Sequence, residues 1–109
     1  MKRTRTYSPV TVQAAQLLGA RVRLARRERR WTLQELADRV GVTHVTMRKV
    51  ERGDLTVALG VAFEAAAVLG VPLFHENRSR RLLEAGRVDD RLAVLPQIVR
   101  RPVEVDDDF

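Results

Sequence analysis

Residues 32–53, TLQELADRVGVTHVTMRKVERG, carry the clearest structural signals in the chain. Thr32 is followed three residues later by Glu35, the spacing at which each side chain can hydrogen-bond the other's backbone N–H at a helix start. Apolar residues then recur at helical spacing up to Gly41, which suits the left-handed conformation that ends many helices. Thr43 offers a second helix start. The stretch therefore predicts two short helices joined by a tight turn, with the second helix protruding.

Helical patterning extends over most of the chain on both sides of this stretch. Val12, Ala15, Leu18, Val22 and Ala25 lie on one face of a helix of about 17 residues, because they recur at spacings of three and four. Hydrophobic residues make up 45% of the chain but aromatic residues only 5%, which favours an aliphatic core between small helices. The sequence predicts an all-α fold of five helices, over residues 11–27, 33–40, 44–52, 59–69 and 72–85.

The two ends of the chain differ from this helical region. Residues 1–11 are polar and basic and are expected to form a flexible arm before a domain at residues 12–85. Residues 86–109 form a tail, in which the apolar part from Ala93 to Val105 is interrupted by two prolines. A short edge strand is therefore the most structure that we expect there.

Charge is distributed unevenly along the 109 residues. Residues 1–52 hold 13 basic and 4 acidic residues (+9), whereas residues 53–109 hold 7 basic and 10 acidic residues (−3). This asymmetry indicates a surface for a polyanion and a separate tail. Eighteen of the 20 basic residues are Arg, which fits phosphate and base recognition and fits a GC-rich genome equally well.

Several classes of protein are excluded or disfavoured by composition. The chain has no Cys, which excludes disulfides and Cys-based zinc or catalytic sites. We expect no membrane span, no secretory signal and no catalytic constellation, and therefore a cytoplasmic protein without a cofactor. His75 has no second ligand at metal spacing, and residues 106–108 (Asp-Asp-Asp) are interpreted as a solvated acidic tail rather than a cation site.

Three segments carry a resemblance to a known family. They are LADRVGVT at residues 36–43, VERG at 50–53 and AAVLGVPLF at 66–74. Together they resemble the Cro-like helix-turn-helix regulators of the phage-repressor class, over about residues 17–74. The resemblance implies a lambda-repressor-like domain that binds DNA with its second motif helix in the major groove. It also implies a homodimer whose two such helices lie roughly 34 Å apart on a pseudopalindromic operator.

The resemblance assigns roles to individual residues. The expected base-contacting residues are His44, Val45, Arg48 and Lys49. Arg or Lys can bond guanine O6 and N7, and Val can pack on a thymine methyl. The expected phosphate-contacting residues are Arg27, Gln34, Thr43, Thr46 and Arg52. The family usually has Gln at the first position of the first motif helix, where this chain has Leu33. Arg26 and Glu51 match a structural ion pair, and the run at residues 26–30 is either a solvated face or a phosphate contact.

A narrower resemblance is to HipB-type regulators. It rests on TLQELA (32–37), RKVERGD (48–54), FEAAAVLGVPLF (63–74) and a tail with Leu95-Pro96, Arg100-Arg101 and an acidic ending before Phe109. It implies an antitoxin that binds a HipA-like serine/threonine kinase and represses the shared operon. The expected partner-binding residues are Leu95, Ile98, Val103 and Phe109, since apolar anchors in a polar tail can fold on a partner. A frayed tail without a partner is the alternative.

Two other functions remain open from the sequence. One is a stand-alone phage-type repressor without a toxin partner, and the other is a protein-binding module that has lost DNA binding. Five apolar residues fit either the core or a subunit interface: Val57, Leu59, Phe63, Leu73 and Phe74.

Overall fold

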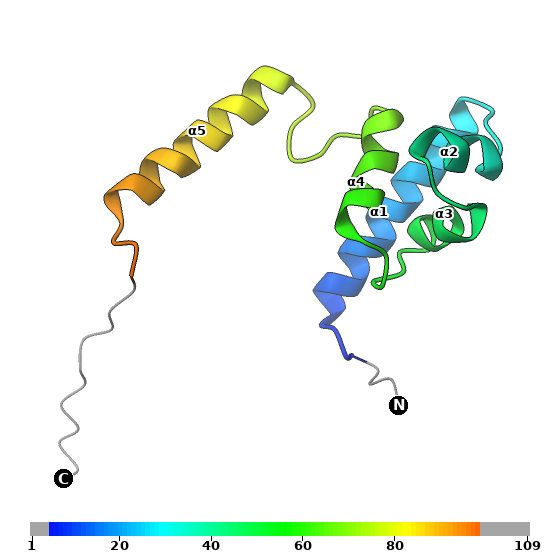
Figure 1. Cartoon of the computed structure of the whole chain (residues 1–109), viewed down its shortest axis with the longest axis horizontal. Helices are drawn as coiled ribbons and strands as arrows, with labels where there is room; N and C mark the ends of the chain where they lie inside the picture. The colour runs from blue at the N-terminus through cyan, green and yellow to red at the C-terminus, as the bar shows by residue number, and fades with distance from the viewer. Residues whose placement is uncertain (1–4, 99–109) are drawn as a thin grey trace, which may run out of the picture. The chain divides into compact units, whose positions relative to one another are not determined.

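The computed structural model describes residues 5–98, which form five helices (Figure 1). They are α1 (Pro9–Glu28), α2 (Leu33–Val40), α3 (His44–Glu51), α4 (Leu59–Val68) and α5 (Arg78–Val94). Residues 5–98 contain no strand, only an isolated antiparallel bridge between Leu73 and His75. The predicted all-α, five-helix fold is confirmed.

The chain divides into two units after Glu76. The first unit contains α1 to α4 and holds the entire buried core. The second unit contains α5, in which no side chain is buried. The division lies earlier than the predicted boundary at residues 85 and 86, because the last helix belongs to the second unit.

Local capping explains where the first two helices begin. The Ser8 Oγ accepts a hydrogen bond from the Thr11 N–H at 3.4 Å, and Pro9 occupies the first turn, where no N–H is needed. Helix α1 thus starts two residues before its predicted start. At α2 the predicted capping box is present: the Thr32 Oγ1 accepts from the Glu35 N–H at 3.0 Å, and the Glu35 carboxylate accepts from the Thr32 N–H at 3.2 Å.

The core of the first unit is aliphatic, as the composition predicted. Its largest fully buried side chains are Leu36, Met47 and Val22, one from each of the first three helices. Ala65 and Ala66 of α4 are also fully buried, so the alanine-rich helix approaches its neighbours closely. The core therefore joins all four helices of the unit.

Two glycines allow α1 to touch the end of α3 through backbone atoms. A Cβ on Gly19 would lie 2.5 Å from the Val50 carbonyl oxygen and 2.6 Å from that of Glu51. Gly53 has a φ of 74°, and a Cβ there would lie 2.7 Å from the Gln16 backbone. These contacts leave no space for side chains, so α1 fixes the carboxyl end of α3.

The prediction for the fifth helix is wrong at both ends. It was expected over residues 72–85, but α5 begins at Arg78, where the Asn77 Oδ1 accepts the Ser79 N–H at 2.7 Å. Phe74 has a φ of 70°, which is incompatible with a helix through that point. Gly86 does not end the helix, because one glycine costs only about 1 kcal/mol among strong helix formers. Ala93 and Val94 are helical rather than part of an edge strand, and residues 99–105 lie outside the described chain.

Candidate nucleic-acid interface

Helix α3 has one face in the core and the other in solvent. Met47 and Val50 are buried in the shared core, and Glu51 beside them is also buried. His44, Val45 and Arg48 point the other way and are exposed, Val45 at 49% of its surface, while Lys49 is half-buried. The four expected base-contacting residues therefore share the outer part of one short helix.

The turn before α3 holds this helix at a fixed angle to α2. Gly41 has a φ of 86°, as its expected role at the helix end requires. The N–H groups of Gly41 and Val42 both donate to the Ala37 carbonyl oxygen, at 2.8 and 3.0 Å. Ala37 itself is fully buried, so a larger side chain would push the two helices apart. The motif is thus a rigid support for the outer face of α3.

The start of α3 presents two hydroxyl groups. The Thr43 Oγ1 accepts the Thr46 N–H at 3.2 Å and donates to the Thr46 Oγ1 at 3.3 Å. Thr46 therefore keeps its own hydroxyl hydrogen for an outside acceptor. A phosphate oxygen near this helix start would also meet the positive end of the helix dipole.

A buried ion pair fastens the end of α3 to α1. The Arg26 Nε donates to the Glu51 Oε2 at 2.6 Å, and its Nη2 donates to the Oε1 at 3.0 Å. The hydrogen bond to Glu51 raises the pKa of the Arg26 guanidinium above its ordinary value, although burial acts against it. Arg23 adds a hydrogen bond to the Glu51 carbonyl oxygen at 3.2 Å. The structure forms the ion pair that the resemblance implied, and the pair joins the end of α3 to α1.

The arginine run at residues 26–30 divides between structural and exposed members. Arg29 donates to the carbonyl oxygens of Val68 and Leu69, at 3.1 and 2.9 Å, and so satisfies the end of α4. Its guanidinium carbon also lies 5.1 Å from the centre of the Trp31 ring. Arg27, expected at a phosphate, is exposed, as is Arg30. Within the run, Arg26 and Arg29 are therefore held by intramolecular hydrogen bonds, whereas Arg27 and Arg30 have exposed side chains.

The remaining expected phosphate contacts, Gln34 and Arg52, are exposed at the edges of the motif. The Gln34 Nε2 donates to the Asp38 Oδ1 at 2.7 Å, which leaves its second N–H hydrogen for another acceptor. Leu33, where the family usually has Gln, packs half-buried against the core. In this chain the first position of α2 thus stabilises the domain.

The model of the helix-turn-helix domain family matches residues 17–79, more than half of the chain. The chain belongs to the helix-turn-helix domain family. Searches of curated proteins and of solved structures found no significant match. The family indicates a DNA-binding regulator, in agreement with the exposed outer face of α3. No helix within residues 5–98 is long and apolar enough to cross a membrane.

Asp54 closes the helix-turn-helix motif with a tight turn after α3. Its Oδ1 accepts hydrogen bonds from the Thr56 N–H at 2.8 Å and from the Thr56 hydroxyl at 2.6 Å. These two bonds hold the pKa of the Asp54 carboxyl below its ordinary value, with smaller contributions from the charges of Lys49 and Arg52. Asp54 therefore stays ionised and offsets part of the positive charge at the end of α3.

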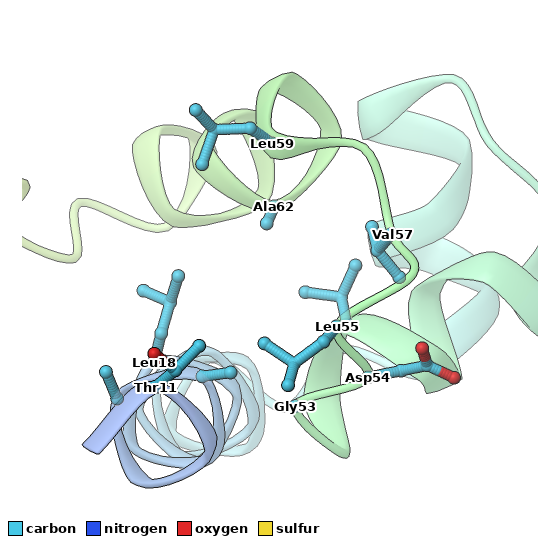
Figure 2. A pocket seen from close by; sticks show the side chains of 11 residues that line it. Thr11, Leu18, Gly53, Asp54, Leu55, Val57, Leu59 and Ala62 are labelled. Carbon is cyan, nitrogen blue, oxygen red and sulfur yellow. The ribbon is translucent and has the colours of Figure 1, made fainter. Parts of the chain in front are cut away.

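The helix-turn-helix unit also has a half-open cleft of about 390 Å³ between α1, the α3–α4 connection and α4 (Figure 2). Its lining is mainly aliphatic, and Ala62 points from α4 into the space, with Leu18 and Leu55 on the other side. The cleft is thus a gap in the apolar packing.

Within the described residues, no three His, Cys, Asp or Glu side chains are grouped as they would be around a metal ion.

The remaining expected residues lie outside the helix-turn-helix core or at its edge. Val57 and Leu73 pack against the core, whereas Leu59 and Phe74 are exposed. Of the expected partner-binding residues, Leu95 and Ile98 are exposed after α5, and Val103 and Phe109 lie outside the described chain.

Three residues that position the helix-turn-helix motif were missed by sequence reasoning. Gly19 lies inside a helical pattern, and an isolated glycine there is a known sign of close backbone packing. Arg23 and Arg29 use backbone carbonyls as partners. No spacing in the sequence distinguishes such arginines from their solvated neighbours, because their partners are 28 and 39 residues away.

Proposed function

We propose that the protein is a sequence-specific transcriptional repressor, the antitoxin of a HipBA-like module in the cytoplasm. It binds an operator as a homodimer, binds a HipA-like serine/threonine kinase, and represses the operon that encodes both. The family membership supports a DNA-binding regulator. The observation that carries the proposal is the outer face of α3, where His44, Val45 and Arg48 are exposed on a helix whose other face is locked in the core.

The proposed mechanism separates affinity from selectivity. Arg27, Gln34 and Arg52, with the hydroxyls at the start of α3, contact phosphates and fix the position of the domain on the duplex. Arg48 and Lys49 bond to guanine, and Val45 packs on a thymine methyl. The helix capping and the Arg26–Glu51 pair hold α3 in this orientation before DNA arrives, so little ordering free energy opposes binding.

The DNA-binding part is tested by a gel shift at stated salt, with the duplex upstream of the chain's own coding sequence and unrelated DNA as competitor. The proposal expects a shift that resists the competitor. Lys49→Ala is expected to weaken this complex by about 1–3 kcal/mol while leaving binding to unrelated DNA nearly unchanged. An equal loss on both duplexes assigns Lys49 to phosphate, and the absence of any specific shift supports a module that has lost DNA binding.

The antitoxin part is tested by copurification from the native host. A HipA-like kinase in the purified complex supports the proposal, whereas repression without such a partner supports a stand-alone repressor. A chain that ends at Pro96 keeps α5 whole and lacks Ile98, Val103 and Phe109. If this shorter chain holds the kinase as tightly as the full chain does, residues 97–109 are not the kinase-binding segment.

A further inference from the structure

Helix α5 is a helix of 17 residues without a buried side chain. Helices of this length are only marginally stable in water, since most helical stability in proteins comes from packing an apolar face. Large apolar side chains are nevertheless exposed along it or directly after it: Leu82, Leu83, Val88, Leu92, Val94 and Leu95. Such a helix lacks the partner that its sequence requires.

The apolar residues of α5 contain a seam with coiled-coil spacing. Ala85, Val88, Leu92 and Leu95 follow one another at intervals of three, four and three residues, which places them in one row along the helix. Leu95 directly follows α5, and its N–H still donates to the Leu92 carbonyl oxygen at 3.2 Å. We call these four residues the α5 seam. Leu83 lies on the opposite face of the helix.

We propose that the α5 seam binds the α5 seam of a second copy of this chain, in antiparallel orientation and with two-fold symmetry. The inference rests on the proposed homodimeric repressor and names the surface that joins its two copies. A two-fold pair needs one patch that is complementary to itself, and a seam of apolar residues flanked by opposite charges meets that condition.

The charges beside the seam select the antiparallel orientation. With Ala85 and Val88 at heptad positions a and d, Glu84 and Arg91 both fall at position g, and Asp89 falls at position e. In an antiparallel pair the g positions of the two helices face each other, so Glu84 of each copy meets Arg91 of the other. In a parallel pair Glu84 would meet Asp89, and two Arg81 side chains would share a layer of the seam. Like charges disfavour the parallel arrangement.

The seam is tested by sedimentation equilibrium of the full chain without DNA, with Leu92→Gln and a matched control, Leu83→Gln. Both leucines lie on the same helix and have similar exposure, 60% and 56%, but they lie on opposite faces. We expect a reversible dimer whose dissociation constant rises about tenfold or more in Leu92→Gln and less than about twofold in the control. Equal effects of the two substitutions, or a monomeric parent chain, would overturn the inference. The fluorescence of Trp31 in thermal unfolding establishes that the helix-turn-helix unit of both variants stays folded.

The orientation is tested by charge reversal. Glu84→Arg and Arg91→Glu each place like charges together twice in an antiparallel pair, so each is expected to weaken the dimer by about fivefold. An equimolar mixture of the two variants is expected to recover the parent affinity, because every facing pair in the mixed dimer again has opposite charges. Stronger association of Glu84→Arg alone indicates a parallel pair and contradicts the proposal, as does a mixture no tighter than its components.

The same variants separate this inference from the proposed function. If the seam substitutions weaken DNA binding but leave the dimer unchanged, α5 contacts DNA and the inference fails. If the parent chain forms the dimer but binds no duplex specifically, the seam stands and the proposed repressor does not.

Discussion

Gly19→Ala tests most sharply how α1 packs against α3. The added Cβ would lie 2.5 Å from the Val50 carbonyl oxygen and 2.6 Å from that of Glu51. Carbon–oxygen contacts in proteins are usually about 3.3 Å or longer, so α1 and α3 must separate by roughly 0.8 Å. Both obstacles are backbone atoms at the end of α3, and no side-chain rotation can relieve them.

The cost of this substitution is the balance of two effects. Overpacking a core costs about 1–3 kcal/mol, and a backbone obstacle places Gly19→Ala near the upper limit. Alanine favours the helix over glycine by about 1 kcal/mol, which acts in the opposite direction. The free energy of unfolding should therefore fall by about 2 kcal/mol. For a domain of this size that change lowers Tm by about 10 °C.

Thermal unfolding followed by circular dichroism at about 222 nm and by the fluorescence of Trp31, the single tryptophan, measures this change. Gly60→Ala is the matched control in the same unit, because a Cβ at Gly60 meets nothing within 4 Å. The control is expected to melt at or slightly above the parent temperature. If Gly19→Ala melts no lower than the parent chain, α1 and α3 do not meet through their backbones.

Three further predictions concern the stability of the same unit. Arg26→Met leaves the Glu51 carboxylate buried without its main partner and should lower the free energy of unfolding by about 3–5 kcal/mol. Adding Glu51→Leu to this variant should restore most of the loss in urea titrations. If the double variant shows no recovery, the ion pair does not have this structural role. Because the pKa of Asp54 is lowered in the folded state, this group stabilises the fold at pH values above 3.8, the ordinary aspartate pKa, and the stabilisation is lost as the pH falls through the folded pKa. The urea midpoint of Asp54→Asn should therefore change less between pH 7 and about pH 3 than that of the parent chain. Equal changes would show that the Thr56 hydrogen bonds are absent in solution. Ala62→Leu places three more carbons in the apolar cleft and should raise the free energy of unfolding by about 1 kcal/mol in the same titrations; a loss would mean that the cleft is closed in solution.

The central motif could be predicted from the sequence because its signals are local. Thr32 and Glu35 cap α2, and Gly41 ends it, so that all the determining contacts lie within a few residues. The inward face of α3 also followed from spacing, because Met47 and Val50 recur at three residues. Where caps and periodicity agree, the sequence alone indicates where a helix begins and ends.

The errors arise where the decisive contacts are distant or where two local signals compete. Pro72 suited a helix start, but Asn77 provides the hydrogen-bonding cap that Val71 lacks, so α5 begins after Asn77. The structural roles of Arg23 and Arg29 depend on partners in α3 and α4. Composition shows that such arginines are abundant, but only the packing of helices decides which of them turn inward.

Selection of the DNA sequence by the exposed face of α3 is measured as a ratio of two affinities. Fluorescence anisotropy at fixed salt measures binding of the full chain to the duplex upstream of its own coding sequence and to a shuffled duplex of the same composition. We expect a preference of about a thousandfold or more for the parent chain. Arg48→Ala should reduce this preference about tenfold or more, whereas Arg52→Ala should weaken binding to both duplexes equally. If the parent chain has no preference, or if Arg48→Ala keeps the full preference, the exposed face of α3 does not select the DNA sequence.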